Sequence, residues 1–259
     1  HASGINRSAT PNCDRTVVTL DLDHCPDENI SCPDDYTLLY TVAPDSDAEE
    51  DPRLSNLLNL LAPAPTRVVY ISSSGVYGDC GGRLIDENQP TNPANKRAQH
   101  RQHAEEKLRR WCATENAGLI TLRVAGIYGP GRLGRKRILA GQPIIAESDA
   151  NPGNRIHVDD LARCCVAAMT ADAASGIYNI SDGDHRSPSW FSRTVAELAG
   201  LAPAPQVPLS EALATFNDTR LSFLRDSRRL DNSKMLAELN PALRYADAEA
   251  GIRASLVNH

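Results

Sequence analysis

The chain has 259 residues, of which 41% are hydrophobic and 23% are charged, with a formal net charge of −6. This composition is typical of a globular protein, and the negative charge argues against nucleic acid as the main partner, because phosphate backbones attract basic surfaces. No apolar run comes near the roughly 18 residues of a membrane-spanning helix, so we expect no membrane span. The cysteines are odd in number and form no C-x-x-C pair, which favours reduced thiols, no metal site and a cytoplasmic location.

Segments with the patterns of strands and helices alternate along the chain. We predict strands at 16–22, 36–43, 67–73, 119–124, 155–158 and 177–180, and helices at 53–61, 99–116, 159–170 and 187–198. This alternation predicts a doubly wound α/β fold with a parallel sheet. Ser187 followed by Pro188 predicts the start of the last of these helices, and Asp159 is the expected cap of the helix before it.

The stretch YISSSGVYGD, residues 70–79, joins an apolar β-rich run to three serines and a glycine. Strands covered on both faces are typical of parallel sheets, and ligands bind at the carboxyl ends of such strands. A hydroxyl can donate and accept a hydrogen bond, so Ser72, Ser73 and Ser74 are candidates for binding a ligand. The alternative is that these hydroxyls only satisfy backbone groups of the loop.

Three further motifs follow, namely LRVAGIYGPGR at 122–132, NRIHVDDLA at 154–162 and IYNISDG at 177–183. Together with YISSSGVYGD they make the chain resemble the extended short-chain dehydrogenase/reductase superfamily, and within it an atypical branch of the NAD-dependent epimerase/dehydratase family. The resemblance covers the chain from Ser3 to the C-terminus. It implies a Rossmann fold that binds the dinucleotide through residues 1–180, and a substrate-side region at 181–259 to which 130–158 also contribute.

The resemblance implies an NAD(P)-dependent oxidoreductase, epimerase or dehydratase that acts on a hydroxyl or carbonyl carbon of a small-molecule substrate. A nucleotide sugar would fit, although a fold-level analogy does not establish one. The other hypothesis is a dinucleotide-binding protein that has lost its chemistry and serves as a sensor or partner protein. A homodimer is left open.

The resemblance also implies which residues contact the coenzyme. Asp21 would meet the adenine amino group and Leu22 would pack against the ring, with a turn role for Asp21 as the alternative. Arg7 would accommodate the 2′-phosphate of NADP, which favours NADP over NAD. The remaining implied coenzyme contacts are Val42, Ala43, Pro44, Ser72, Ser73, Arg101, Ala125, Gly126 and Ile127.

Two features of the family are missing. Its first strand and the glycine-rich turn that seats the pyrophosphate do not occur in the sequence. Our interpretation is that a unit of about thirty residues, which would precede His1, is missing from this sequence. The catalytic Tyr-x-x-x-Lys pair is replaced by Arg97 and Arg101. An arginine stays protonated, so Arg97 cannot act as the acid or base that tyrosine supplies.

Ser74 takes the family position that hydrogen-bonds the reacting oxygen of the substrate. His100, Tyr77 and Tyr128 are the candidates for the missing acid or base, with an exposed helix histidine and packed loop tyrosines as the alternatives. Arg132 suits an anionic group such as a phosphate, whereas His157 could equally buttress a strand and a helix cap. The substrate contacts implied in full are Ser74, Gly75, Tyr77, Arg97, Arg132, Asn154 and His157.

Overall fold

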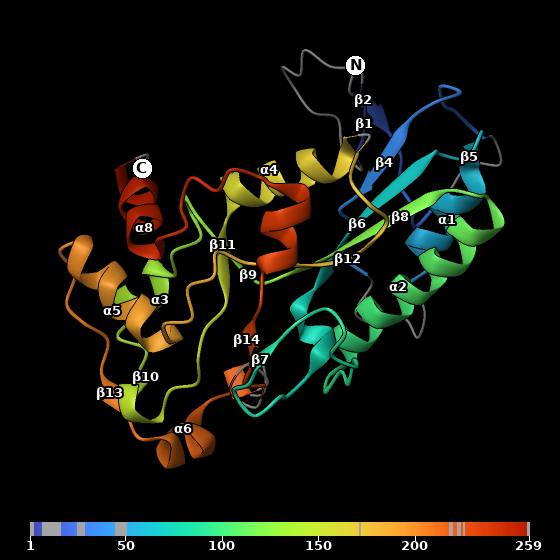
Figure 1. Cartoon of the computed structure of the whole chain (residues 1–259). Helices are drawn as coiled ribbons and strands as arrows, with labels where there is room; N and C mark the ends of the chain where they lie inside the picture. Colours follow the sequence, from blue (N-terminus) through green and yellow to red (C-terminus); the bar gives the residue numbers. More distant parts are fainter. Residues whose placement is uncertain are drawn as a thin grey trace.

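The computed structural model confirms the α/β class expected from the sequence (Figure 1). The residues that it describes are 3–6, 17–24, 29–44, 51–170, 172–217, 220–221, 224 and 226–257. Within these ranges, no helix is both long and apolar enough to cross a membrane.

A four-stranded parallel sheet in the order β12-β8-β6-β4 forms the centre of the fold. Its strands are β4 (Thr37–Tyr40), β6 (Arg67–Ser73), β8 (Gly118–Val124) and β12 (Gly176–Ile180). In the pairing register, Tyr40 lies opposite Tyr70 and Ser73 lies opposite Val124. Because all four strands run the same way, their carboxyl ends meet at one edge of the sheet, where the serine-rich segment lies.

Shorter parallel pairs surround this sheet. They are β1 (Gly4–Asn6) with β2 (Val17–Thr19), β9 (Gly126–Tyr128) with β11 (Arg155–His157), β3 (Ile30–Ser31) with β5 (Leu61–Ala62), β7 (Leu84–Ile85) with β14 (Arg229–Leu230), and β10 (Ile144–Ile145) with β13 (Gln206–Val207).

The strand predicted at 16–22 is shorter than expected, because β2 ends at Thr19. It ends early because the backbone turns after it, with the His24 N–H donating to the Asp21 carbonyl at 3.1 Å.

Two helices cover one face of the central sheet. The Asp51 side chain caps α1 (Pro52–Leu60), and the Asn95 side chain caps α2 (Lys96–Thr114). The helices and the strand residues that face them form one apolar core, made of Tyr40, Leu54, Leu57, Leu58, Val68, Tyr70, Ala104, Leu108 and Cys112. This core fixes α2 against the end of β6.

The helix α4 (Val158–Met169) covers the opposite face, as Figure 1 shows. Neighbouring strand residues point to opposite faces, so Val69 packs toward α4 while Val68 packs toward α1 and α2. The cap of α4 is His157 and not the expected Asp159. Its Nδ1 accepts the Asp159 N–H at 3.1 Å, because Asp159 already lies in the first turn.

The C-terminal part packs beside the sheet through α3 (Arg135–Leu139), α5 (Pro188–Leu198) and α8 (Ala248–Val257), while α6 (Leu209–Thr215) lies against β10. A π-helix at Met235–Leu239 joins the core beneath α4. As predicted, α5 begins after Ser187, whose hydroxyl accepts the Trp190 N–H at 2.8 Å. Close approach of α8 to β9 requires Gly251, since a Cβ there would lie 2.2 Å from the Tyr128 hydroxyl oxygen.

Candidate functional site

The three serines at the end of β6 have different partners. Ser72 donates a hydrogen bond to the Glu105 carboxylate at 2.5 Å. The Ser73 hydroxyl accepts the Gly75 N–H at 3.1 Å and so caps the short 3-10 helix η1 (Ser74–Tyr77). Ser74 is 7% exposed, and within the described part of the chain its hydroxyl has no hydrogen-bond partner. Ser74 therefore keeps a hydroxyl that can bind a ligand.

A buried ion pair supports this strand end. Glu105 accepts two hydrogen bonds from the Arg123 guanidinium, at 3.2 and 2.8 Å, and the Arg123 side chain is 6% exposed. The guanidinium lies 4.7 Å from the centre of the Tyr77 ring, and the Tyr77 hydroxyl donates to Asn179 at 2.7 Å. The motifs did not reveal Glu105, Arg123 or Asn179 as partners. A lone arginine inside an apolar strand was the signal that could have found Arg123.

The two candidate tyrosines are both buried. Tyr77 is 1% exposed and Tyr128 is 3% exposed, and burial raises the pKa of each phenol. This burial agrees with the alternative that the two residues are packed loop tyrosines. It argues against either phenol exchanging protons with a substrate.

Helix α2 carries the two arginines that replace the family's tyrosine and lysine. Arg101 donates to the Ile71 carbonyl at 2.6 Å and to the Tyr70 hydroxyl at 3.2 Å, so its guanidinium is anchored near the end of β6. Arg97 lies one turn earlier and is exposed. Arg101 thus places a fixed positive charge beside the strand that leads to Ser74.

His100 lies between these arginines on α2 and is 8% exposed, so the alternative of an exposed helix histidine is wrong. Its Nδ1 is fully buried and has no hydrogen-bond partner among the described residues. Buried polar atoms nearly always have a partner, and each exception needs an explanation. The unsatisfied nitrogen keeps His100 a candidate for a ligand contact. The Tyr128 hydroxyl is likewise buried and unpartnered among the described residues, whereas the Tyr77 hydroxyl already donates to Asn179.

The end of β2 is held by local bonds. The Asp21 carboxylate accepts the Asp23 N–H at 3.0 Å, so the turn role of Asp21 is present. The Leu22 carbonyl accepts a hydrogen bond from Asn56 of α1 at 2.8 Å. Contacts of Asp21 and Leu22 with adenine stay predictions. Arg7, which we expect to favour NADP, lies outside the described residues.

The expected coenzyme contacts after β4 and β8 follow the carboxyl ends of their strands. Val42 and Pro44 are half-buried and Ala43 is exposed, which leaves the chain after β4 accessible. Ala125 is 7% exposed and its N–H donates to the Ile180 carbonyl at 3.0 Å. Gly126 and Ile127 already belong to β9, which pairs with β11.

His157 and Asn154 are built into the frame of the protein. His157 is 1% exposed, its Nε2 lies 3.1 Å from the Ser255 hydroxyl, and burial lowers its pKa. The Asn154 side chain donates to the Arg228 carbonyl and accepts the Leu230 N–H, both at 2.8 Å. The geometry supports the buttress role, and their contact with substrate stays a prediction.

Arg132 lines a pocket of about 430 Å³ in the C-terminal part, together with Arg137 and Arg220. We name it the arginine pocket. Arg220 stacks 3.4 Å from the centre of the Phe216 ring and donates to the Pro143 carbonyl, and burial and the nearby Arg137 charge lower its pKa. Three guanidinium groups around apolar walls suit an anionic ligand. Sequence reasoning missed Arg137 and Arg220 because distant segments bring them together.

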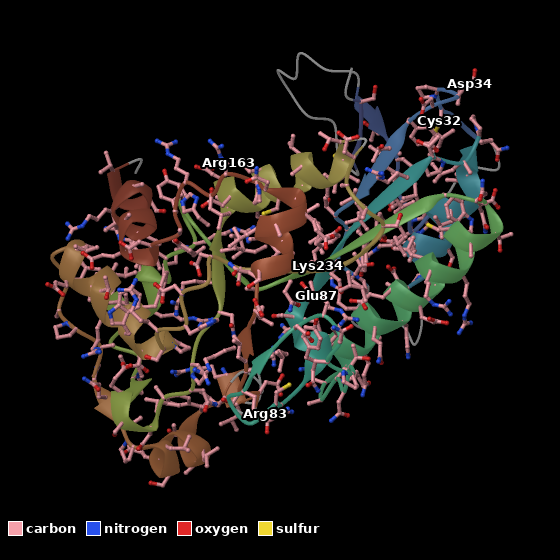
Figure 2. All side chains as sticks on the ribbon, viewed as in Figure 1. Cys32, Asp34, Arg83, Glu87, Arg163 and Lys234 are labelled. Atoms are coloured by element: carbon pink, nitrogen blue, oxygen red, sulfur yellow. The ribbon has the colours of Figure 1, made fainter. Side chains whose placement is uncertain are left out.

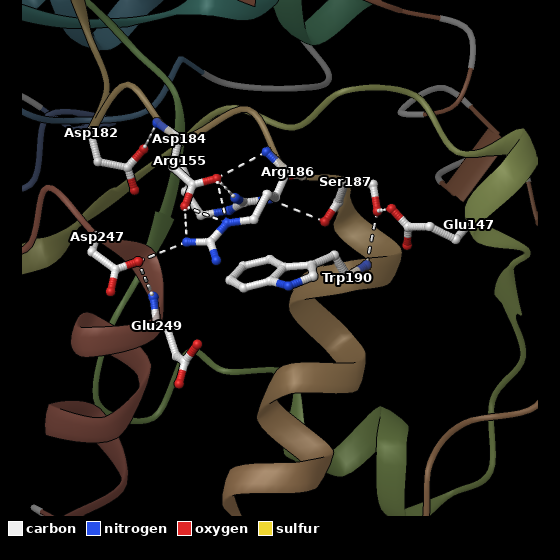
Figure 3. A network of polar contacts seen from close by, with 9 residues as sticks. All are labelled: Glu147, Arg155, Asp182, Asp184, Arg186, Ser187, Trp190, Asp247 and Glu249. Atoms are coloured by element: carbon white, nitrogen blue, oxygen red, sulfur yellow. Dashed lines mark hydrogen bonds and ion pairs between the residues drawn. The ribbon is translucent and has the colours of Figure 1, made fainter.

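A polar network beside this pocket ties the C-terminal helices to β11 (Figure 3). Arg155 donates to Asp184 at 3.2 Å, and Arg186 binds both Asp184 and Asp247. One carboxylate oxygen of Asp182 accepts the Asp184 N–H, while the other is buried and unpartnered among the described residues. Burial raises the pKa of Asp182 to about 7.

The parallel sheet with helices on both faces, and the serines and fixed cations at its carboxyl edge, define a Rossmann-type α/β protein. Residues 54–181 match the model of the NAD dependent epimerase/dehydratase family. This match is to the same family that the motifs of the chain resemble.

Known relatives agree with this assignment. Protein YeeZ of Escherichia coli (strain K12) is 31% identical over 143 residues, which are 55% of this chain and 50% of YeeZ. The chain thus spans about half the length of the curated relatives it matches.

Solved structures extend the likeness to nearly the whole chain. A conserved protein of unknown function from Silicibacter pomeroyi DSS has a TM-score of 0.80 at 29% identity, over 98% of this chain and 89% of that one. MoeE5, solved in complex with UDP-glucose and NAD, has a TM-score of 0.75 at 20% identity over the same shares of the two chains. The likeness to MoeE5 shows the fold alone.

Proposed function

We propose that the chain is an NAD(P)-dependent oxidoreductase, epimerase or dehydratase that acts on a hydroxyl or carbonyl carbon of a small molecule. The observation that carries this proposal is the Ser74 hydroxyl, which is unpartnered among the described residues at the carboxyl end of β6. A hydroxyl there can orient an alcohol or a carbonyl by donating or accepting a hydrogen bond. It lies in the part of the chain that matches the family.

Side chains at this edge of the sheet fit a nicotinamide dinucleotide. The accessible chain at Val42, Ala43 and Pro44 permits close approach, Arg101 offers a fixed charge for a phosphate or ribose, and His100 has an unsatisfied buried nitrogen. When bound, the nicotinamide supplies or accepts the hydride. We favour NADP over NAD on the strength of Arg7, and the support for this is in the sequence only.

His100 is the residue that we propose as the acid or base in place of the absent tyrosine. Imidazole is the side chain best suited to proton transfer near neutral pH. The orphan Nδ1 can accept a proton or a hydrogen bond without breaking an existing one among the described residues. Arg97 and Arg101 would hold negative charge nearby, and they cannot take over the proton transfer.

The arginine pocket supports a substrate that carries phosphate, for which a nucleotide sugar is our first choice. MoeE5, which has the same fold, was solved with UDP-glucose. The pocket lies in the part that we assign to the substrate, residues 181–259 with 130–158, whereas 1–180 would bind the dinucleotide. We further propose that the protein works in the cytoplasm without nucleic acid, and a homodimer is to be tested by its mass in solution.

The decisive experiment compares Ser74→Ala with the parent protein in coenzyme binding and in turnover of UDP-glucose and related nucleotide sugars. We expect a loss in turnover of more than about tenfold with coenzyme affinity nearly unchanged, because Ser74 would touch substrate and not dinucleotide. Ser148→Ala, which removes an exposed hydroxyl bonded to Asp149, is the matched control. Unaltered turnover in Ser74→Ala would remove Ser74 from the mechanism. Coenzyme binding without turnover of any substrate would favour the sensor hypothesis.

A further inference from the structure

A second pocket lies on the face of the sheet that α1 and α2 cover. Its volume is about 690 Å³, and it is bounded by α2, by Leu119, Thr121 and Arg123 along β8, and by the start of β12. We name it the β12 pocket. Among the residues that line it are Thr121, Arg123, Glu105, His103, Leu119 and Ile177.

The packing of α4 on the other face of the sheet decides which side chains of β8 face the pocket. Along β8, Ile120, Leu122 and Val124 point into the core beneath α4, so Leu119, Thr121 and Arg123 point the opposite way. Ile177 of β12 lies opposite Thr121 in the pairing register and so shares that side of the sheet. On this side of the sheet, α2 borders β8, and among the described residues the space between α2 and the start of β12 is open as the pocket.

A strand from another chain is a poor match for this place. The free edge of β12 is already occupied by side chains, since Glu87 accepts the Asn179 N–H at 2.8 Å and Lys234 donates to the Ile177 carbonyl at 2.9 Å. Both side chains lie beside β12 in Figure 2. Capped edge groups do not template strand addition. The occupant must therefore be recognised by the floor of the pocket.

The floor combines a hydroxyl with a neutralised ion pair. Thr121 is 3% exposed, and its hydroxyl has no hydrogen-bond partner among the described residues. Its hydroxyl oxygen is nevertheless not fully buried. The hydroxyl oxygen therefore keeps a small exposed surface, and Thr121 lines the pocket. Beside it, Arg123 and Glu105 cancel each other's charge through two hydrogen bonds.

These groups determine the chemistry of a ligand. The Thr121 hydroxyl can donate and accept hydrogen bonds. The Glu105 Oε2 atom can accept a further hydrogen bond, since Arg123 is its one donor among the described residues. The ion pair of Glu105 and Arg123 adds no net charge to the pocket. Leu119 and Ile177 add apolar surface to the pocket. We propose that the β12 pocket binds a neutral, polyhydroxylated small molecule, such as a free monosaccharide or polyol. This site shares no lining residue with the arginine pocket, and the Glu105–Arg123 pair, which also bonds Ser72, separates it from the coenzyme edge. The proposal does not depend on the proposed function.

The experiment is a titration of the whole chain with D-glucose, followed by NMR of the Leu119 and Ile177 methyl groups. We expect saturable shifts of both residues, with the affinity lowered at least fivefold in Thr121→Val and held within twofold in Thr121→Ser. Valine keeps the shape of threonine and removes only the hydroxyl, whereas serine keeps the hydroxyl. Thr114→Val, at an exposed site on α2, is the control that should bind like the parent.

Three results would overturn the proposal. They are the absence of saturable shifts at Leu119 and Ile177, equal affinities of Thr121→Val and the parent, and saturable shifts with inorganic phosphate in place of glucose. The last would show that the site selects an anion. None of these outcomes involves the nicotinamide coenzyme, so a failure here is distinguishable from a failure of the proposed function.

Discussion

The Glu105 carboxylate and the Arg123 guanidinium are joined by two hydrogen bonds of 3.2 and 2.8 Å, next to the serine-rich end of strand β6. Glu105 comes from α2 and Arg123 from β8, and the same carboxylate accepts the Ser72 hydroxyl. The pair therefore fixes the helix that carries Arg97, His100 and Arg101 against the strand that leads to Ser74. Stability and site geometry depend on the same contact.

Glu105→Ala should destabilise the protein strongly. The substitution leaves the Arg123 charge buried without its partner, and breaking a buried pair in this way costs about 3–5 kcal/mol. Urea unfolding measures the loss. Glu106→Ala is the control, because that carboxylate pairs with Arg109 and Arg110 on the exposed side of α2 and its removal should change stability little. Equal losses in the two variants would contradict the assigned role of the buried pair.

Asp182 should make stability fall as pH rises through the weakly acidic range. Burial raises the pKa of its carboxyl to about 7 in the folded protein, whereas an unfolded aspartate titrates near about 4. Between these values the folded state holds a proton that the unfolded state releases, so the free energy of unfolding decreases with pH by at most about 1.4 kcal/mol per unit. Asp182→Asn should remove this slope in unfolding experiments between about pH 4 and 7.

Asp247 provides the control of opposite sign. The hydrogen bond from Arg186 lowers the pKa of Asp247, so its contribution to stability is present above the unfolded pKa and is lost as pH falls through the folded value. Asp247→Asn should therefore flatten the acidic limb of the stability curve. Parallel pH profiles for the parent and Asp182→Asn would show that Asp182 is ionised in the folded protein.

Replacing Arg97 by tyrosine and Arg101 by lysine should not by itself produce strong dehydrogenase activity. The Arg101 guanidinium is held by the Ile71 carbonyl and the Tyr70 hydroxyl, and a lysine cannot reproduce that planar arrangement. Catalytic groups must be placed within about half an ångström. The assay is the substrate-dependent change in nicotinamide absorbance. An increase of about a hundredfold, which is the size of an acid–base effect, would show that the pocket had accommodated the usual pair.

Arg220→Gln should weaken binding of UDP-glucose about fivefold or more while leaving coenzyme affinity unchanged. Glutamine keeps a polar side chain of moderate length but removes the charge that Arg220 brings to the arginine pocket. Calorimetric titration of both ligands measures the effect. Arg253→Gln on α8, where the arginine pairs with Glu249, is the matched control and should bind like the parent. Unchanged affinity in Arg220→Gln would place the phosphate elsewhere.

Much of the central frame could be predicted from local patterns. The apolar runs that became β6, β8 and β12 were recognisable because strands buried on both faces need continuous apolar residues. The start of α5 followed from the capping preference of Ser187 and the proline after it. The position of Ser74 at a strand end was a consequence of the same strand pattern.

Tertiary structure decided the partners of those residues. Glu105 with Arg123, and Arg137 with Arg220, come from segments far apart in the chain, and a pattern read along the sequence does not report which distant side chains meet. The cap of α4 and the burial of His100 also differ from the expectations, because packing against other elements set them. The sequence by itself determined where strands end and which hydroxyls follow them, since these depend on neighbours along the chain. The packing of helices on the sheet decided the rest, and only the folded chain defines that packing. It set the surroundings of the Ser74 hydroxyl, the neutralised pair of Glu105 and Arg123, and the β12 pocket.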